Sequence, residues 1–221
     1  MPTMQLRDGH TALVVVDMQR YYVEHDSPFQ SYFRKRHPGA MDYISTRCDE
    51  LVTPHIQQLL ELWRTANQPV LFLRLCGTQP DRSDLHPHFR GSYEKALSRG
   101  FPDTYPLRSD PYSLVIPALQ PLEHEMSFCK TTYSGFTTGD LGQYLLSSSI
   151  QTLVFTGLAT SQCVETTARD ASDRGYKVVH VADAQADYEE VTHRASLYSS
   201  QAVCGGEIYH TEQLLRVPLP S

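Results

Sequence analysis

The segment TALVVVD, residues 11–17, constrains the fold of this chain more than any other. Its aliphatic and β-branched residues leave no polar face, so the pattern predicts a strand that is buried on both sides. Such strands are typical of the centre of a parallel sheet covered by helices on both faces. Because Asp17 ends the run, a carboxylate is expected at the carboxyl end of that strand.

Strand and helix patterns alternate along the rest of the chain. Further strands are predicted at residues 69–74, 125–129, 152–157, 177–182 and 207–209. Helices are predicted at residues 47–66, 140–146, 163–174 and 191–202. The alternation predicts an α/β fold, a Rossmann-like three-layer α/β/α arrangement around a mainly parallel sheet. No linker or repeat separates two halves, so residues 1–221 are expected to form a single domain.

Residues 76–120 do not follow this alternation. Six prolines there interrupt any long element, namely Pro80, Pro87, Pro102, Pro106, Pro111 and Pro117. A long irregular segment in a compact domain is usually functional, for example as a lid. We expect this segment to close the site or to contact another subunit.

Charge and composition exclude several classes of partner. The net charge is −6 and no block of Lys or Arg occurs, which argues against nucleic acid. No apolar run approaches the ~18 residues of a membrane span, and the first ten residues lack the layout of a signal peptide. The five cysteines form no CxxC pair. Reduced thiols in the cytoplasm are therefore expected, four of them as packing residues.

Cys163, within GLATSQCVETTARD (residues 157–170), is the strongest candidate nucleophile. It lies where a predicted helix begins, and unpaired N–H groups and the helix dipole favour a thiolate there. Asp17, Lys130 and Cys163 each follow a predicted strand, so a parallel sheet would gather them at one edge. Asp17 could then act as general base for the thiol, while the ammonium group of Lys130 favours thiolate and carboxylate.

This trio predicts cleavage of an amide. The thiolate would attack the carbonyl carbon, and backbone N–H groups of the 158–163 turn would hold the oxyanion. Ammonia or an amine would leave, and water activated by Asp17 would hydrolyse the acyl-enzyme.

Three motifs in this order resemble those of the isochorismatase-like cysteine hydrolases: VVVDMQ at residues 14–19, K-x-x-Y-S-G-F at 130–136 and G-L-A-T-x-x-C-V at 157–164. The resemblance runs from about Ala12 to the last strand and leaves residues 76–120 without a motif. It implies a six-stranded sheet, an Asp–Lys–Cys triad at Asp17, Lys130 and Cys163, no cofactor or metal, and a homo-oligomer, a dimer or tetramer.

The resemblance has two implications for the turn before the nucleophile. One is a cis peptide bond between Leu158 and Ala159. The other is an oxyanion hole formed by the backbone amides of Ala159 and Cys163.

The motifs also indicate which branch of the family the chain resembles. Isochorismatases proper lack the nucleophilic cysteine, so Cys163 favours C–N cleavage. YSGF and ETTARDA (residues 133–136 and 165–171) are similar to the ureide-cleaving branch, which includes N-carbamoylsarcosine amidase, biuret hydrolase and ureidoacrylate amidohydrolase. This similarity implies a small ureido or carbamoyl amide as substrate.

Two other functions stay open. A zinc-assisted nicotinamidase would carry D-x-H-P-x-x-H after the second strand, but Asp84, His86 and His88 have a different spacing and position. They are expected to be solvated loop residues, with metal binding as the alternative. A non-catalytic binding protein on the same fold is the third reading, and the presence of all three triad residue types disfavours it.

Five further side chains are candidates for contact with the substrate. Tyr22, Phe29 and Tyr133 could line a pocket for a planar amide, with packing as the alternative. The side-chain amides of Gln162 and Gln201 could bind a ureido group, with simple solvent exposure as the alternative.

Overall fold

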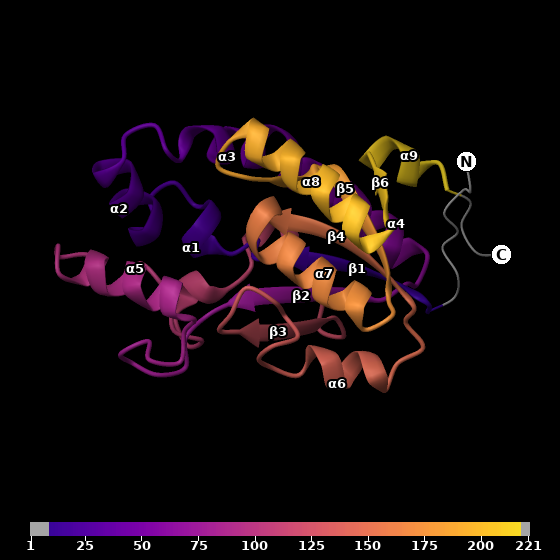
Figure 1. Cartoon of the computed structure of the whole chain (residues 1–221), viewed down its shortest axis with the longest axis horizontal. Helices are drawn as coiled ribbons and strands as arrows, with labels where there is room; N and C mark the ends of the chain where they lie inside the picture. Colours follow the sequence, from indigo (N-terminus) through magenta and orange to yellow (C-terminus); the bar gives the residue numbers. More distant parts are fainter. Residues whose placement is uncertain (1–8, 218–221) are drawn as a thin grey trace.

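The computed structural model describes residues 9–217, so most of the segment in which we looked for a signal peptide lies outside the described residues. Its centre is a six-stranded sheet in which all neighbours pair in parallel, in the order β3-β2-β1-β4-β5-β6 (Figure 1). The strands are β1 (Thr11–Val16), β2 (Val70–Leu75), β3 (Met126–Lys130), β4 (Thr152–Leu158), β5 (Lys177–Ala186) and β6 (Glu207–Tyr209). The predicted α/β fold is confirmed.

Helices cover both faces of the sheet. α4 (Thr53–Thr65) connects β1 to β2, whereas α7 (Glu165–Asp173) connects β4 to β5 in the opposite direction across the sheet. Right-handed crossovers therefore place the two helices on opposite faces. α8 (Glu190–Cys204) packs on α7, and α9 (Thr211–Leu215) packs on α4. α6 (Leu141–Leu146) precedes β4.

Three helices lie beyond the carboxyl ends of the strands, at the left of Figure 1: α1 (Arg20–Val23), α2 (Pro28–Arg36) and α5 (Pro87–Leu97). α5 corrects the expectation that prolines exclude a long element from residues 76–120. Pro87 occupies the first turn, where a missing N–H breaks no helical hydrogen bond. Phe89, Tyr93 and Ala96 then form its buried face.

The predicted helix over residues 47–66 is three shorter pieces. α3 (Asp42–Arg47) continues into a wider, π-helical turn at Cys48–Val52 and then into α4. Pro54 has no N–H to donate to the carbonyl group four residues earlier, which interrupts the regular ladder. Two 3-10 turns, Pro111–Ser113 and Pro117–Leu119, follow α5, and a second π-helical turn, Thr160–Val164, precedes α7.

β1 and β4 approach each other closely at Gly157. All six residues of β1 are buried. Gly157 of β4 has φ +99°, and a Cβ atom there would lie 2.0 Å from the carbonyl oxygen of Val16. Only glycine therefore fits. No helix within residues 9–217 is long and apolar enough to cross a membrane.

Candidate active site

The three predicted catalytic side chains lie where the strand order reverses. β1 pairs with β2 on one side and with β4 on the other, and such switch points are the usual ligand sites of open α/β sheets. Asp17 follows β1, Lys130 ends β3, and Cys163 lies in the turn after β4. Asp17 has φ 49°, a left-handed conformation that is uncommon outside glycine and clusters at functional sites.

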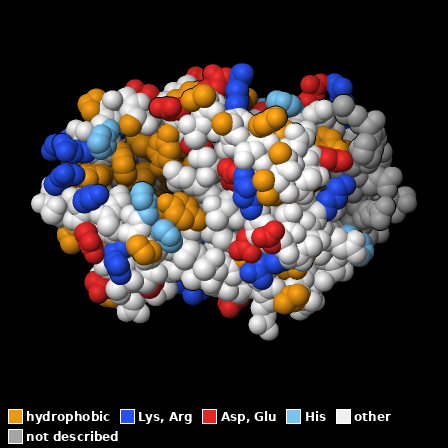
Figure 2. Space-filling model, viewed as in Figure 1, with side chains coloured by type: hydrophobic (Ala, Val, Ile, Leu, Met, Phe, Trp, Pro, Cys, Tyr) orange, Lys and Arg blue, Asp and Glu red, His pale blue; other side chains and the backbone are white. Residues whose placement is uncertain are grey.

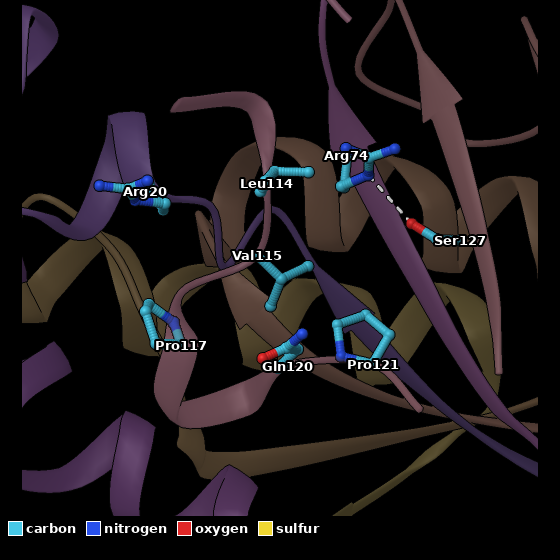
Figure 3. Close-up of a pocket in the computed structure, with 8 residues that line it drawn as sticks. All are labelled: Arg20, Arg74, Leu114, Val115, Pro117, Gln120, Pro121 and Ser127. Carbon is cyan, nitrogen blue, oxygen red and sulfur yellow. Dashed lines mark hydrogen bonds between the residues drawn. The ribbon is translucent and has the colours of Figure 1, made fainter. Parts of the chain in front are cut away.

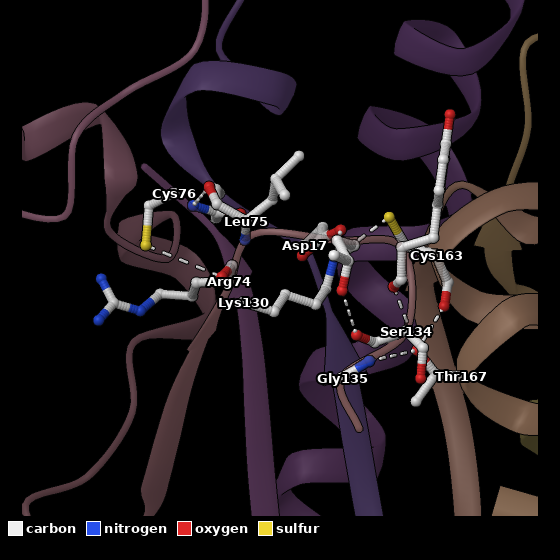
Figure 4. A network of polar contacts seen from close by, with 12 residues as sticks. Asp17, Arg74, Leu75, Cys76, Lys130, Ser134, Gly135, Cys163 and Thr167 are labelled. Atoms are coloured by element: carbon white, nitrogen blue, oxygen red, sulfur yellow. Dashed lines mark hydrogen bonds and ion pairs between the residues drawn. The ribbon is translucent and has the colours of Figure 1, made fainter. Parts of the chain in front are cut away.

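Lys130 joins the other two residues. Its Nζ donates to Asp17 Oδ2 at 2.8 Å, to Cys163 Sγ at 3.2 Å and to the Thr132 carbonyl oxygen at 3.2 Å (Figure 4). Asp17 and Lys130 are each 1% exposed, and Cys163 is 4% exposed. Asp17 Oδ1 is buried and has no hydrogen-bond partner among the described residues.

Burial and the two charges set the protonation of the trio. Burial raises the pKa of the Cys163 thiol, the Asp17 carboxylate raises it further, and Lys130 opposes both. The pKa of Lys130 is above its ordinary value: burial acts to lower it, but Asp17 and Cys163 more than compensate. Burial and Asp17 therefore oppose the thiolate that the helix start favours. Asp17 as the general base for the Cys163 thiol stays a prediction.

A set of buried contacts fixes the turn that carries Cys163. This turn is a π-helical segment, Thr160–Val164, at the start of α7. Ser161 N donates to Asp187 Oδ2 at 2.6 Å, and Thr160 Oγ1 lies 2.8 Å from His193 Nδ1. Asp187 follows the end of β5 and is 1% exposed.

The expected cis peptide bond between Leu158 and Ala159 is not found: no peptide bond within residues 9–217 is cis. Ala159 has an ordinary extended backbone (φ −84°, ψ 148°), and a trans bond is the lower-energy state for a non-proline residue by about 3–4 kcal/mol. The oxyanion hole at the amides of Ala159 and Cys163 stays a prediction.

The YSGF and ETTARDA motifs bind to each other. Gly135 N donates to Thr167 Oγ1 at 3.2 Å, and Ser134 Oγ donates to Asp170 Oδ2 at 2.7 Å. These bonds hold the turn after Lys130 against α7 (Figure 4). The two motifs thus fix the position of Lys130 relative to the helix that begins at Cys163.

A cavity of about 660 Å³ opens between α2 and α5, and no triad residue lines it. Gln162, the neighbour of Cys163, lines it. Figure 2 shows the hollow at the α2 and α5 end of the molecule, with apolar, basic and histidine side chains around it. The other lining residues are Tyr32, Phe33, Arg36, His37, Pro87, His88, Phe89, Gly91, Ser92, Lys95, Arg99, Tyr105 and Tyr188.

Four of the five predicted substrate contacts lie at or near this cavity. Gln162 lines it directly. The Tyr22 hydroxyl donates to the Tyr188 hydroxyl at 2.8 Å, the Phe29 ring lies 4.6 Å from that of Phe33, and the Tyr133 ring lies 4.4 Å from that of Phe89.

Gln201 is the exception. It is exposed near the end of α8, whereas the contact of that helix with the nucleophile turn is at His193. Eight helical residues separate the two by about 12 Å. Gln201 therefore lies away from the triad of its own chain.

Asp84, His86 and His88 have other partners. Asp84 Oδ2 accepts from Thr78 N and Thr78 Oγ1, and His86 Nδ1 accepts from His88 N at the start of α5. Within residues 9–217, no group of three or more His, Cys, Asp and Glu side chains is arranged to hold a metal ion.

A second cavity, of about 380 Å³, lies beside β2 and β3 (Figure 3). Arg20, Arg74 and Val115 line it, and unlike the larger cavity it reaches no residue next to Cys163 in the chain. Arg74 donates to Ser127 Oγ and Arg20 to Glu24, so both guanidinium groups have partners. This cavity is not the candidate active site.

Cys129 differs from the packing cysteine that the sequence predicts. A hydrogen bond from Cys76 lowers the pKa of Cys129 to about 6, and the charge of Arg74 acts in the same direction. Arg74 Nη2 lies 3.4 Å from Cys129 Sγ. Cys129 is partly exposed and lies outside the triad.

Sequence reasoning missed three contributors to the site: α5, Asp187 and Tyr188. Phe89, Tyr93 and Ala96 repeat at helical spacing, which could have revealed α5. Asp187 resembles Asp17 in following a buried strand, but the fifth strand was predicted to end at residue 182, too early to show this.

The Isochorismatase domain family matches residues 11–213. The chain belongs to the isochorismatase family. It is therefore a hydrolase of that family, as the order of its motifs predicts.

The chain is similar to several named family members. It is 28% identical over 134 residues to the uncharacterized isochorismatase family protein YrdC of Bacillus subtilis, an alignment that covers 61% of this chain and 60% of YrdC. It is 29% identical to the ureidoacrylate amidohydrolase RutB of Stutzerimonas stutzeri, covering 91% of this chain and 80% of RutB. The crystal structure of a cysteine hydrolase from Pseudomonas syringae pv. phaseolicola has a TM-score of 0.73 and 29% identity, covering 98% of this chain and 97% of that one.

Proposed function

We propose that this protein is a cysteine-dependent amidohydrolase that cleaves a C–N bond through a thioester intermediate. The observation that carries the proposal is the position of the Lys130 ammonium, 2.8 Å from the Asp17 carboxylate and 3.2 Å from the Cys163 sulfur. This geometry holds a base and a nucleophile in one buried site, where electrostatic effects are stronger than in water.

Acylation uses Asp17 twice. Asp17 accepts the thiol proton as Cys163 Sγ forms a bond to the carbonyl carbon, and the amides of Ala159 and Cys163 hold the oxyanion. The C–N bond then breaks, and the proton on Asp17 passes to the departing nitrogen. Ammonia or an amine leaves, and the acyl group remains on sulfur.

Deacylation repeats the sequence with water. Asp17 removes a proton from water, whose oxygen bonds to the thioester carbon, and the C–S bond breaks to release an acid. Lys130 stabilises the departing thiolate until that sulfur regains the proton from Asp17. Because the sulfur has to stay reduced, we place this activity in a reducing compartment such as the cytoplasm.

For the substrate class we propose a ureido or carbamoyl amide. The similarity to RutB over most of both chains supports this choice. Nicotinamide hydrolysis assisted by zinc is the alternative, and the contacts of Asp84 and His86 with their own loop favour it less. Ammonia release from ureides, carbamoyl amines and nicotinamide, together with the metal content of the purified protein, separates the two.

The test of the mechanism is Cys163→Ala. We expect this variant to release no ammonia while its circular dichroism spectrum and Tm remain close to those of the parent, because the substitution removes one sulfur from a packed site. Cys48→Ala, at another buried cysteine, is the matched control and should retain activity. Ammonia release by Cys163→Ala at a rate near that of the parent would refute the thioester mechanism.

A further inference from the structure

The cavity between α2 and α5 carries a charge opposite to that of the whole chain. Arg36, Lys95 and Arg99 line it, and its described lining residues include no Asp or Glu, although the net charge is −6. Figure 2 shows Lys and Arg side chains gathered at this end of the molecule. A cavity lined by one sign of charge raises the local concentration of oppositely charged ligands.

The three cations are free to bind an anion. None of them forms an ion pair with another residue in the 9–217 range, whereas Arg20, Arg64 and Arg169 each pair with a glutamate. Arg99 Nη1 donates to the Tyr32 hydroxyl at 2.9 Å, which holds its guanidinium against α2 and leaves other N–H groups available.

One of the cations, Lys95, lies away from the end of α5 that contacts Tyr133. Tyr133 lies between the start of α5 and the triad. Its ring contacts Phe89 of α5, and Tyr133 itself follows Lys130 by three residues. Lys95 is seven residues beyond His88, which is about 10 Å along the helix. Aromatic rings line the cavity between these ends, at Phe33, Phe89 and Tyr105.

We propose that the enzyme prefers elongated amides whose anionic group lies at least roughly 10 Å from the cleaved carbonyl, taking the α-helical rise from His88 to Lys95 as the span of the cavity. Arg36, Lys95 and Arg99 bind that group, and the aromatic walls contact the body of the molecule. An extended chain covers about 3.3–3.6 Å for every three backbone bonds, so roughly nine bonds span the distance. The inference rests on the proposed amidohydrolase function and adds where the negative charge of its substrate lies.

The experiment compares two series of primary amides. One is the monoamides of linear dicarboxylic acids from about four to ten carbons, and the other is the unsubstituted amides of matching length. We expect kcat/KM for the acid series to exceed that of the neutral series by at least tenfold near nine backbone bonds, and less for shorter chains. The advantage should fall in 0.5 M NaCl, because salt screens exposed charges.

Single variants identify the binding groups. Arg36→Gln, Lys95→Gln and Arg99→Gln should each lower the ratio of acid to neutral kcat/KM by roughly threefold, mainly through KM, and the triple variant by at least tenfold. Arg194→Gln, at an exposed arginine on α8 outside the cavity, should leave the ratio unchanged. Calorimetric binding of the acid amides to Cys163→Ala gives a readout that needs no turnover.

The outcomes separate the two proposals. If neutral and acid amides are cleaved equally at every length, or if the shortest acid is preferred, the inference about the cavity is wrong and the thioester mechanism stands. If Cys163→Ala binds long acid amides but the parent cleaves no amide, the amidohydrolase function fails while the anion preference of the cavity remains.

Discussion

At the scale of single residues, Asp17 and Lys130 act on the Cys163 thiol in opposite directions. Asp17 raises the pKa of that thiol and Lys130 lowers it. Asp17→Asn should therefore shift the pH profile of Cys163 alkylation by iodoacetamide to lower pH. Lys130→Met should shift the same profile to higher pH. Both variants should lose about a hundredfold or more in kcat, because Asn accepts no proton and Met stabilises no anion.

The alkylation measurement needs a Cys129→Ser background. Cys129, with a pKa of about 6, would otherwise react first near neutral pH. Following the Cys163 peptide by mass spectrometry resolves the remaining thiols. A shift of both variants in the same direction would contradict the assigned charges.

The sequence predicts that the three triad residues meet at one edge of the sheet, but it does not predict the protonation state of the Cys163 sulfur. Asp17, Lys130 and Cys163 each follow a strand of a parallel sheet, so topology alone brings them to one edge. Whether the sulfur rests as thiol or thiolate depends on burial, and the motif around residue 163 does not encode the depth at which the turn lies. Gln201 shows the same limit, since only the packing of α8 decides which face it occupies.

At the scale of elements, the close approach of β1 and β4 depends on one glycine. In Gly157→Ala the new methyl group would overlap the Val16 backbone, and the positive φ adds strain. We expect a loss of about 3–5 kcal/mol in the free energy of unfolding, measured by urea titration. Activity should fall as well, because Asp17 directly follows β1 and the turn that carries Cys163 directly follows β4.

Gly175→Ala is the matched control for this prediction. Gly175 also has positive φ, 90°, but a Cβ atom there meets no heavy atom within 4 Å. Its cost should therefore be that of the backbone conformation alone, about 1–2 kcal/mol. Equal losses for the two variants would show that the approach of β1 to β4 is not the constraint.

Element boundaries were hardest to predict where polar residues continue a strand. β5 extends to Ala186, where Gln185 and Ala186 pair with Gly157 and Leu158 of β4, and the buried Gln185 side chain donates to the Phe155 carbonyl oxygen at 2.8 Å. That long-range bond is invisible in the local pattern, which turns polar after residue 182. The sequence prediction missed α5 for a different reason. The pattern indicates a helix breaker at Pro87, but this residue lies in the first turn of the helix, which tolerates proline.

At the scale of the whole molecule, two buried histidines make stability depend on pH. Burial lowers the pKa of His180 and of His193 to about 4 each, below the unfolded value of about 6.5. The stabilisation from a neutral His180 is complete above pH ~6.5 and is lost as pH falls toward 4, by about 3 kcal/mol in total. Tm should therefore fall between pH 7 and pH 4.5.

His180→Gln should flatten this dependence, whatever its effect on Tm at neutral pH. His124→Gln, at an exposed histidine, should leave the slope unchanged. A slope that is the same in both variants would remove His180 as a source of the pH dependence.

Self-association is the second prediction at this scale. Val191 and Tyr198 on α8 are 68% and 77% exposed, and their spacing of two helical turns puts them on one apolar face of the helix. We expect two copies to cover it, giving a dimer or tetramer by light scattering. Tyr198→Arg should shift the mass toward the monomer, while Leu146→Arg, at an exposed leucine on α6, should not. A monomeric parent would contradict this expectation.

α2 and α5, which wall the cavity, lie outside the sheet that holds the three reactive groups. Relatives could therefore differ in these two helices and accept new substrates while keeping the same chemistry. Grafting the two helices onto another member would transfer selectivity without rebuilding the catalytic edge.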